Sequence, residues 1–373
     1  MRISIDATPL LLRSAGVKNY LYYWIRHLRR LAAGHEILTF PFSARIGELD
    51  HERSLIGRWP TLAGLGLLHL ANYCPLPVLD WLGGRCDVFH AGQQLRNPPR
   101  RCRLTATIYD MTCWLMPEMH TPANVKAARR FAERVLLRAD GLMAISAATR
   151  ADAVRVLGLK PERIEVVHPG VPEEFFRVPP QAAAAAREKH RLARPYALFV
   201  GTIEPRKNLE TLLDAWSELP RALGEEFELV VAGPAGWAEG ALLERLRSSR
   251  GVRYLGYVPE PDLPGITAGA TVFVYPSLYE GFGFPVAQAM AAGVPVITSN
   301  VSSLPEITSG AARLVDPRSV TELAAALERL LLQPAERSEL ARRGIEVAQR
   351  YRWEACAQRS LGFFERVAGL SVP

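Results

Sequence analysis

Short apolar runs separate amphipathic stretches throughout the second half of the chain. The runs lack the polar alternation of half-exposed strands, so we expect buried strands over 196–200, 227–232, 252–255, 270–275 and 295–298. Apolar residues at helical spacing predict helices over 209–216, 241–247 and 286–292. Strands buried on both faces are typical of a parallel sheet covered by helices. The alternation therefore predicts a doubly wound α/β domain.

The first half repeats this rhythm less clearly. We expect strands over 2–5, 87–90, 104–109, 142–145 and 164–167, and helices over 20–31 and 124–137. Ser146 follows a predicted strand and supplies the hydroxyl that the N-cap of a further helix needs. The chain thus predicts two Rossmann-like domains facing a central cleft, because ligands of open α/β sheets bind beyond the carboxyl ends of the strands.

A proline-rich sequence, Val178-Pro179-Pro180, separates the halves and leads into an alanine-rich helix. A length of 373 residues supports two domains, because it exceeds what one hydrophobic core usually fills. We assign residues 1–178 to the first domain and 179–353 to the second. A last helix over 353–367 follows the completed second sheet.

The hydropathy pattern predicts a cytoplasmic chain without a membrane-spanning helix. Its most apolar stretch, 55–82, is interrupted by charged and proline residues, whereas spanning needs about 20 nearly unbroken apolar residues. The N-terminus alternates like a strand, reaches an acid at Asp6 and has no small-residue cleavage site. Five cysteines without C-x-x-C spacing favour isolated thiols over a zinc site or a disulfide framework.

The positive charge lies entirely in the first half. Residues 1–180 hold 24 Lys and Arg against 16 Asp and Glu, whereas residues 181–373 hold 21 against 22. This asymmetry favours an anionic partner for the first domain: a nucleic acid, a membrane surface or a phosphorylated substrate. Nucleic acid is disfavoured, because the chain has no recognisable motif and no interleaving of aromatic and basic residues.

One candidate site is the segment 201–208, Gly-Thr-Ile-Glu-Pro-Arg-Lys-Asn, between a predicted strand and a predicted helix. Arg206 and Lys207 offer a planar fork and a point charge, which together suit a diphosphate. A helix N-terminus disfavours cations, so two adjacent ones favour a bound anion over a solvated basic pair.

A second candidate site, residues 279–291, also lies between a strand and a helix. Its backbone N–H groups at Gly281 and Gly283, with the helix N-terminus, suit an anion, and Glu280 is an acceptor for sugar hydroxyls. The dinucleotide fingerprint G-x-G-x-x-G is absent, since Val286 occupies its third glycine position. A nicotinamide-dependent oxidoreductase is therefore disfavoured.

These motifs resemble those of retaining glycosyltransferases of family 4, which have the GT-B fold. The similarity covers nearly the whole chain, and 201–208 is similar to mannosyltransferases of bacterial surface-polysaccharide assembly. Further matching segments are 14–17, 107–110, 117–118, 144–146, 166–171, 232–234, 255–258, 293–296 and 304–306.

The resemblance implies that the second domain binds a nucleoside-diphosphate sugar and the first domain binds the acceptor. A C-terminal helix over 354–373 would cross back to the first domain. The implied catalytic residues are Arg206, Lys207, Glu280 and Asp110. The implied donor-binding residues are Gly16, Gly201, Glu204, Val258, Gly281, Phe282, Gly283 and Gln288.

The resemblance also implies an activity without cofactor or divalent metal. Arg206 and Lys207 would stabilise the departing diphosphate in place of a metal, and no D-x-D motif is present. Glu280 would orient hydroxyls of the transferred sugar, and no enzyme nucleophile is expected. The expected reaction moves a hexose, with GDP-mannose favoured, to a glycan or lipid-linked glycan.

Two residues depart from the family pattern. Gln288 replaces the carboxylate that holds the nucleotide ribose, and Tyr109 replaces a histidine before Asp110. Asp110 itself suits either a loop cap or a site residue. These departures motivate an alternative function as a non-catalytic binding or scaffold subunit.

Basic residues of the first domain suggest peripheral attachment to the cytoplasmic face of a membrane. Lys126, Arg130, Arg134 and Arg138 recur every four residues on one predicted helix, and 100–103 adds a second basic cluster. With the apolar loop region 62–82, they suit an anionic membrane that carries a lipid-linked acceptor. The alternative is a solvated helix face beside an ordinary core.

Overall fold

The computed structural model describes residues 1–13, 16–42, 45–51, 53–74, 78–82, 86–236 and 240–370. The chain divides into two compact units. The first comprises Met1–Gly170 with Trp353–Pro373, and the second comprises Val171–Arg352. Each contains one six-stranded parallel sheet, which confirms the predicted class of two Rossmann-like α/β domains.

The sheet of the first unit has the strand order β2-β1-β3-β4-β5-β6. Its strands are β1 (Arg2–Asp6), β2 (Glu36–Phe40), β3 (Val88–Ala91), β4 (Arg103–Ile108), β5 (Gly141–Ala144) and β6 (Ile164–Val166). Of these, only β2 was not predicted. Its sequence, Glu-Ile-Leu-Thr-Phe, begins with a charged residue and is too short to show a clear period.

Seven α-helices belong to the first unit among the residues that the structure describes. They are α1 (Gly16–Leu31), α2 (Arg58–Tyr73), α3 (Val78–Leu82), α4 (Thr112–Leu115), α5 (Pro122–Phe131), α6 (Ala147–Leu157) and α17 (Trp353–Ala368). Ser146 caps α6 by accepting a hydrogen bond from the Thr149 N–H, as predicted. The predicted apolar loop over 62–82 is wrong, because most of it forms α2 and α3; Pro75 to Pro77 lie outside the described residues.

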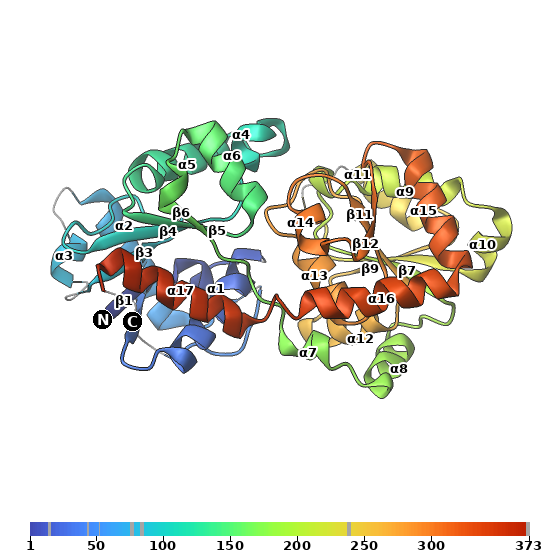
Figure 1. Cartoon of the computed structure of the whole chain (residues 1–373), viewed down its shortest axis with the longest axis horizontal. Helices are drawn as coiled ribbons and strands as arrows, with labels where there is room; N and C mark the ends of the chain where they lie inside the picture. The colour runs from blue at the N-terminus through green and yellow to red at the C-terminus, as the bar shows by residue number, and fades with distance from the viewer. Residues whose placement is uncertain are drawn as a thin grey trace. The chain divides into compact units, whose positions relative to one another are not determined.

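The terminal helix α17 lies against α1, although the two helices come from opposite ends of the sequence (Figure 1). The Trp24 indole donates to the Ser360 hydroxyl at 2.9 Å. Trp353 packs edge-on against Tyr20, with ring centroids 5.6 Å apart. A Cβ at Gly170 would approach the Trp353 side chain to 2.4 Å, so a glycine is required there. The helix thus completes the core of the first unit.

The sheet of the second unit has the order β12-β11-β10-β7-β8-β9. Its strands are β7 (Tyr196–Val200), β8 (Glu228–Ala232), β9 (Val252–Gly256), β10 (Val272–Tyr275), β11 (Val296–Ser299) and β12 (Ala312–Val315). Only β12 was not predicted. The chain builds one side of β7 with β8 and β9, and then the other side with β10, β11 and β12.

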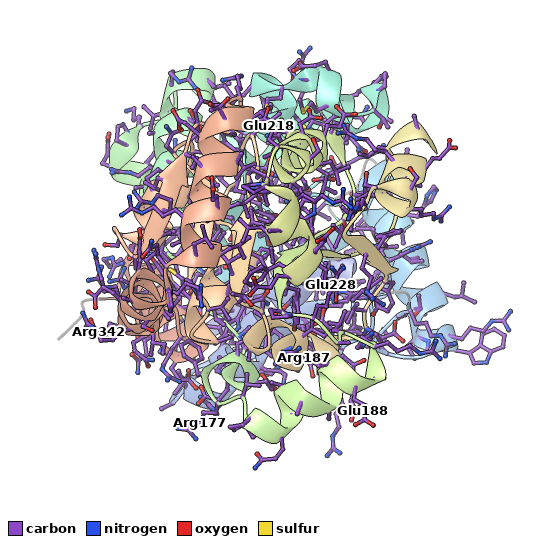
Figure 2. All side chains as sticks on the ribbon, turned by 90° about the vertical axis from the view of Figure 1, so that its right-hand side faces the viewer. Arg177, Arg187, Glu188, Glu218, Glu228 and Arg342 are labelled. Carbon is purple, nitrogen blue, oxygen red and sulfur yellow. The ribbon has the colours of Figure 1, made fainter. Side chains whose placement is uncertain are left out.

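Ten α-helices belong to the second unit among its described residues. They are α7 (Glu173–Phe176), α8 (Pro180–Lys189), α9 (Leu209–Ser217), α10 (Arg221–Glu226), α11 (Gly240–Ser248), α12 (Leu263–Ala268), α13 (Phe284–Ala291), α14 (Leu304–Thr308), α15 (Val320–Leu332) and α16 (Pro334–Ala348). Charged side chains such as Glu188 on α8 and Arg342 on α16 extend outward from the ribbon (Figure 2).

The boundary predicted after Val178 lies eight residues beyond the division after Gly170. Residues after Gly170 already pack in the second unit: the Val171 N–H donates to the Tyr351 carbonyl at 2.7 Å, and Phe175 is buried. Pro180 is the first residue of α8 rather than part of a linker, because a helix tolerates proline in its first turn. The second predicted boundary, after residue 353, differs from the observed one by a single residue.

Among the helices of the described residues, none combines the length and the apolar composition that crossing a bilayer requires.

Candidate functional site

The strand order of the second unit reverses direction between β7 and β10, which pair with each other. In open α/β sheets, ligands bind at such a switch point, outside the carboxyl ends of the strands. The loop after β7 is the segment 201–208, and the loop after β10 runs from Pro276 to Gly283. Both candidate motifs of the second unit therefore meet at the topological site of an α/β ligand pocket.

Hydrogen bonds join these two loops. Asn208 adopts a left-handed conformation with φ 60°, and its amide donates to the Pro276 carbonyl at 3.0 Å. The Leu278 N–H donates to the Arg206 carbonyl at 2.9 Å. The backbone that carries Arg206 and Lys207 is thus fixed against the backbone that carries Glu280.

Two serines in the loop between β11 and α14 also hold the Glu280 backbone. The Glu280 N–H donates to the Ser302 hydroxyl, and the Ser303 hydroxyl donates to the Glu280 carbonyl, both at 2.9 Å. Gly283 has a φ of 92°, and a Cβ there would lie 2.7 Å from Leu304. Glycine is therefore required where the loop turns into α13.

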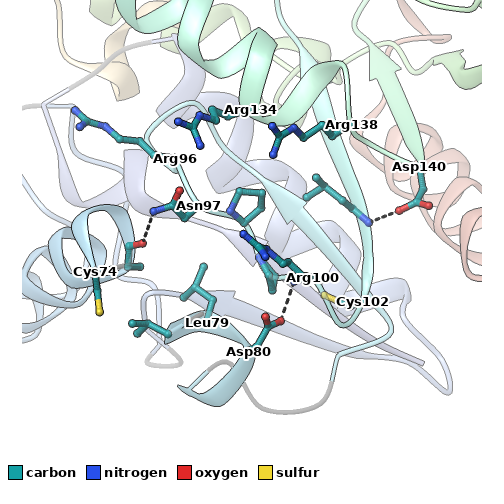
Figure 3. A pocket seen from close by; sticks show the side chains of 15 residues that line it. Cys74, Leu79, Asp80, Arg96, Asn97, Arg100, Cys102, Arg134, Arg138 and Asp140 are labelled. Carbon is teal, nitrogen blue, oxygen red and sulfur yellow. Dashed lines mark hydrogen bonds between the residues drawn. The ribbon is translucent and has the colours of Figure 1, made fainter. Parts of the chain in front are cut away.

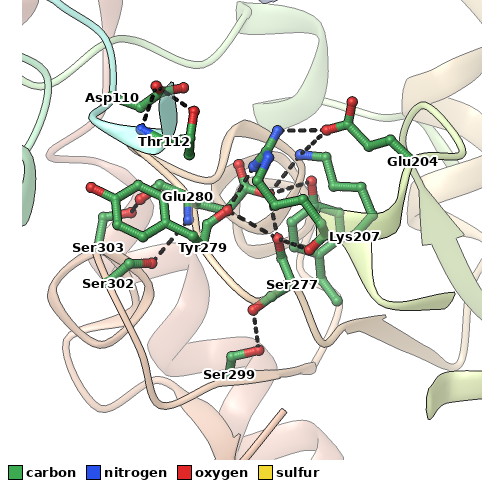
Figure 4. Close-up of polar contacts among 12 residues, drawn as sticks. Asp110, Thr112, Glu204, Lys207, Ser277, Tyr279, Glu280, Ser299, Ser302 and Ser303 are labelled. Carbon is green, nitrogen blue, oxygen red and sulfur yellow. Dashed lines mark hydrogen bonds and ion pairs between the residues drawn. The ribbon is translucent and has the colours of Figure 1, made fainter. Parts of the chain in front are cut away.

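Four charged side chains form one cluster at the carboxyl ends of β7 and β10 (Figure 4). Lys207 Nζ donates to Glu280 Oε1 at 2.6 Å, and Arg206 Nη1 lies 3.1 Å from the same oxygen. Arg206 Nη2 donates to Glu204 Oε1 at 2.6 Å. We call Glu204, Arg206, Lys207 and Glu280 the charge cluster. The structure thus brings together three predicted catalytic residues and one predicted donor-binding residue.

Two further groups contact Glu280 that the sequence analysis missed. The Tyr275 hydroxyl donates to Glu280 Oε1 at 3.1 Å, and the Ser277 hydroxyl donates to it at 2.7 Å. Lys207 Nζ also lies 5.2 Å from the centre of the Tyr275 ring. Tyr275 ends the buried strand β10 and Ser277 follows it. This position could have identified both residues from the sequence, because ligands bind beyond the carboxyl ends of such strands.

Opposing effects set the ionisation of Glu280. Burial by itself raises the pKa of Glu280, but the charges of Lys207 and Arg206, with hydrogen bonds from Lys207 and Ser277, lower it to about 2. Burial lowers the pKa of Lys207 from its ordinary value, and Glu280 opposes that shift. Glu280 is therefore a carboxylate at neutral pH and acts only as a hydrogen-bond acceptor.

The charge cluster shows that two adjacent cations at this helix start do not by themselves require a bound anion. In the structure, Glu204 and Glu280 already compensate Arg206 and Lys207, so the four formal charges sum to zero. The cations are held in a fixed geometry by the protein itself, with Lys207 and Glu280 less than 10% exposed.

The remaining donor-binding candidates of the second unit lie around the same strand ends. Gly201 approaches Gly233 so closely that a Cβ on Gly233 would lie 1.9 Å from the Gly201 carbonyl oxygen. Val258 is buried just after β9, and Gln288 is buried on α13. The Phe282 ring packs edge-on against Tyr351 with centroids 5.4 Å apart, so its side chain serves the core.

Two predicted site residues, Gly16 and Asp110, belong to the first unit. Gly16 is the first residue of α1, and a Cβ there would meet no atom within 4 Å; Ser14 and Ala15 lie outside the described residues. Asp110 Oδ1 accepts hydrogen bonds from both the N–H and the hydroxyl of Thr112, at 3.1 and 2.8 Å (Figure 4). Asp110 is thus a loop cap, and its catalytic role stays a prediction.

Tyr109 has no proton to exchange near neutral pH, because burial raises the pKa of its hydroxyl far above its ordinary value. Its ring packs edge-on against Tyr20, with centroids 5.3 Å apart. This aromatic packing is a structural reason for tyrosine at a position where the family pattern has histidine.

The predicted row of basic residues does not lie on one regular helix. Lys126 and Arg130 belong to α5, but residues Ala132–Leu136 form a π-helical turn that includes Arg134. Arg138 lies beyond the end of this π-helical turn, so the four basic residues do not share one continuous helix. Arg134 and Arg138 instead line a cavity that does not include Lys126 or Arg130.

Within the described ranges, no group of three or more His, Cys, Asp or Glu side chains has the geometry to hold a metal ion.

Two family models match this chain, one in each half. Residues 181–347 match the family described as "Glycosyl transferases group 1", and residues 14–175 match the family described as "Glycosyltransferase Family 4".

Two mannosyltransferases are among the similar sequences. O-antigen chain mannosyltransferase B of Escherichia coli is 33% identical over 283 residues, which cover 75% of this chain and 74% of that protein. MMP alpha-(1->4)-mannosyltransferase of Mycolicibacterium hassiacum is 31% identical over 241 residues, which cover 63% of this chain and 56% of that protein.

Among solved structures, sucrose-phosphate synthase from Thermosynechococcus elongatus superimposes with a TM-score of 0.73 over 100% of both chains. Its sequence identity to this chain is 23%, so the likeness concerns the fold.

Proposed function

Because this chain belongs to glycosyltransferase family 4, we propose that it is a retaining mannosyltransferase. The donor is GDP-mannose, and the acceptor is a glycan or a lipid-linked glycan. Similarity to two mannosyltransferases supports the sugar. The observation that carries the proposal is the charge cluster at the switch point of the second sheet, where Glu204 and Glu280 hold the Arg206 guanidinium and the buried Lys207 ammonium in a fixed geometry.

In this proposal, Arg206 and Lys207 stabilise the charge that grows on the diphosphate as the sugar departs. Fixed charges in a buried site do this without reorganising during the reaction. Glu204 and Glu280 hold the two cations in place, at 2.6 Å each. The backbone of Gly281, Phe282 and Gly283, at the N-terminus of α13, adds N–H groups for the same anion.

The bond between the sugar C1 and the diphosphate oxygen breaks, and a bond between C1 and the acceptor hydroxyl oxygen forms on the same face. The acceptor proton passes to the departing phosphate oxygen, so no enzyme nucleophile is needed. Glu280, as a carboxylate, accepts from a hydroxyl of the sugar. Gly16, Gly201, Glu204, Val258 and Gln288 contribute to nucleotide binding.

The test is turnover of GDP-mannose by the full chain, compared with UDP-, ADP- and dTDP-sugars. We expect transfer from GDP-mannose and a loss of kcat of about a hundredfold or more in Arg206→Ala, the cost of removing one preorganised electrostatic contact. Arg221→Ala, an exposed arginine on α10, is the matched control and retains turnover. Transfer from another nucleotide sugar alone would overturn the donor assignment.

No divalent metal takes part in the proposed reaction, because the two cations supply the charge. Turnover should therefore survive treatment with a chelator. Activity that disappears with chelator and returns with manganese would contradict the role of Arg206 and Lys207.

We further propose that the enzyme works in the cytoplasm, attached peripherally to the membrane by its basic first unit. Lys126, Arg130 and Arg134 are exposed or partly exposed on α5 and the π-turn that follows, and they suit anionic headgroups. Flotation with anionic vesicles tests this attachment, and an absence of binding at low salt would exclude it.

A further inference from the structure

A polar cavity lies in the first unit, at the edge of the sheet opposite to the carboxyl ends of its strands. Its volume is about 370 Å³, and its lining includes Cys102 and Asp140, which directly precede β4 and β5. Asp6 and Tyr109, near the carboxyl ends of β1 and β4, line a different, smaller cavity of about 140 Å³. The larger cavity is thus separate from the strand ends at which α/β sheets bind their usual ligands.

Four arginines are among the residues that line this cavity (Figure 3). Arg96 and Arg100 come from the segment between β3 and β4, and Arg134 and Arg138 come from the π-turn and the residues after it. We call this the arginine pocket. Arg134 lies within the π-turn and Arg138 lies two residues after its end.

The carboxylates of the arginine pocket are engaged elsewhere. Asp80 Oδ1 accepts from the backbone N–H groups of Arg100 and Arg101, at 2.8 and 3.1 Å. Asp140 accepts from the Arg103 guanidinium at 3.0 Å and from the Leu104 N–H at 2.8 Å. Among the described residues, no carboxylate lies within 4.0 Å of the guanidinium nitrogens of the four pocket arginines.

Uncompensated guanidinium groups around one cavity match the chemistry of a phosphate. Each planar fork can donate two parallel hydrogen bonds to phosphate oxygens. The four arginines come from two segments and can together bind one phosphomonoester or diphosphate. A ligand with a single carboxylate would leave most of their positive charge uncompensated. The charge cluster differs in this respect, since its cations are already paired.

An exposed apolar face adjoins the arginine pocket. On α2, Trp59, Leu62, Leu70 and Tyr73 are 78%, 52%, 48% and 60% exposed. Their spacing places them within one narrow arc of the helix. Arg96 lies 4.7 Å from the centre of the Tyr73 ring, and the next residue, Cys74, lines the pocket. Exposed aromatic and leucine side chains next to arginines are typical of a helix that lies in a membrane interface.

We propose that the arginine pocket binds the phosphate group of a membrane lipid while the apolar face of α2 enters the bilayer interface. The lipid carries a phosphomonoester or a diphosphate, and the bilayer is the single occupant of the α2 face. The inference rests on the peripheral attachment proposed above and adds a defined headgroup site to it. It does not depend on the identity of the sugar donor.

Flotation of the full chain tests the proposal, with vesicles of phosphatidylcholine alone and of phosphatidylcholine with phosphatidic acid, a phosphomonoester lipid. We expect binding to the second kind only. The double variant Arg96→Gln with Arg138→Gln should weaken it by about tenfold or more. The control, Arg221→Gln with Arg342→Gln, removes the same charge from exposed sites of the second unit and should change binding less than twofold. Trp59→Ser with Tyr73→Ser should weaken binding to the same vesicles.

Inorganic pyrophosphate distinguishes the two sources of phosphate. In our proposal, it competes with the vesicles and binds the wild type but not the Arg96→Gln, Arg138→Gln variant. Binding of pyrophosphate without flotation would overturn the lipid assignment, and flotation insensitive to both arginine substitutions would overturn the arginine pocket. Transfer from GDP-mannose to a soluble acceptor is measured in parallel. Its absence, with flotation intact, would refute the proposed reaction and leave this inference standing.

Discussion

At the end of β10, a single carboxylate oxygen organises the charge cluster. Glu280 Oε1 is approached by Lys207, Arg206, Tyr275 and Ser277 within 3.1 Å. Such an oxygen neutralises cations, satisfies buried hydroxyl groups and fixes the spacing of the two loops at once. Removing it affects both the stability of the second unit and the chemistry.

Glu280→Gln should lower the free energy of unfolding by about 3 kcal/mol, because it leaves the buried Lys207 ammonium without its counter-charge. Lys207→Met should cost a similar amount, and the double variant less than the sum of the two, as expected for groups in contact. Urea unfolding measures all three. Glu225→Gln, an exposed carboxylate that is also paired with two arginines, is the control and should leave the midpoint nearly unchanged. Strict additivity of the two buried substitutions would contradict the coupling.

Gly233→Ala should destabilise the second unit by at least about 2 kcal/mol, because its Cβ would overlap the Gly201 carbonyl oxygen. We expect the loop after β7 to shift and turnover to fall with stability. Gly224→Ala on α10 is the matched control, since a Cβ there meets no atom within 4 Å, and alanine should stabilise it slightly. Thermal unfolding of both variants measures the difference, and equal midpoints would show that the close approach is unimportant.

At the scale of elements, β3 and β4 enclose a histidine that does not take part in the proposed reaction. His90 is 2% exposed and lies 3.0 Å from the hydroxyls of both Thr105 and Thr107. Burial lowers the pKa of His90 from 6.5 to about 3. His90 is therefore still neutral in the folded protein at pH values near 6.5, at which it begins to bind a proton in the unfolded chain.

This difference predicts a pH dependence. Above pH 6.5 neither state binds the proton; between 6.5 and about 3 only the unfolded state does, so stability falls as the pH falls. The slope from this one group is at most about 1.4 kcal/mol per pH unit. His90→Gln should flatten the decline of the unfolding midpoint between pH 6.5 and 4.5, whereas His69→Gln, on the exposed part of α2, should not. An identical slope in all three proteins would disprove the assignment.

At the scale of the molecule, the chain passes twice between the units, after Gly170 and after Arg352. The second passage delivers α17 to the first unit, where Trp353 is 2% exposed against Tyr20 and Tyr23. A segment that follows the second sheet in the sequence thus supplies core residues to the first. Folding of the first unit is complete only when the last helix is present.

Trp353→Ala should therefore destabilise the first unit by about 3–5 kcal/mol, as expected for a buried aromatic side chain. Hydrogen exchange should show the loss of protection in α1 and β1, with little change in β7 and β8. Trp59→Ala, with its side chain 78% exposed, is the control and should leave exchange unchanged. A loss confined to the second unit would contradict the place of α17.

The sequence by itself determined the fold class, the family and most strands. Apolar runs without polar alternation are typical of strands in a sheet covered on both faces. These runs, with the less regular pattern of the first half, predicted ten of the twelve strands, and the family comparisons confirm the resemblance. Glycines and charged residues placed directly after strands also identified Arg206, Lys207 and Glu280, because parallel strands bring their carboxyl ends to one edge.

Only the tertiary structure decided what compensates those charges and where the basic residues face. The ion pairs of Glu280 with Lys207 and Arg206 join residues 73 and 74 positions apart, so they depend on which loops become neighbours, and the periodicity of one segment does not encode that. The gathering of Arg134 and Arg138 with Arg96 and Arg100 around one cavity, and the packing of Trp353 on Tyr20, likewise join residues distant in sequence. The local pattern of apolar and polar residues determines the helices and strands. The packing of these elements against one another determines which charges surround each side chain.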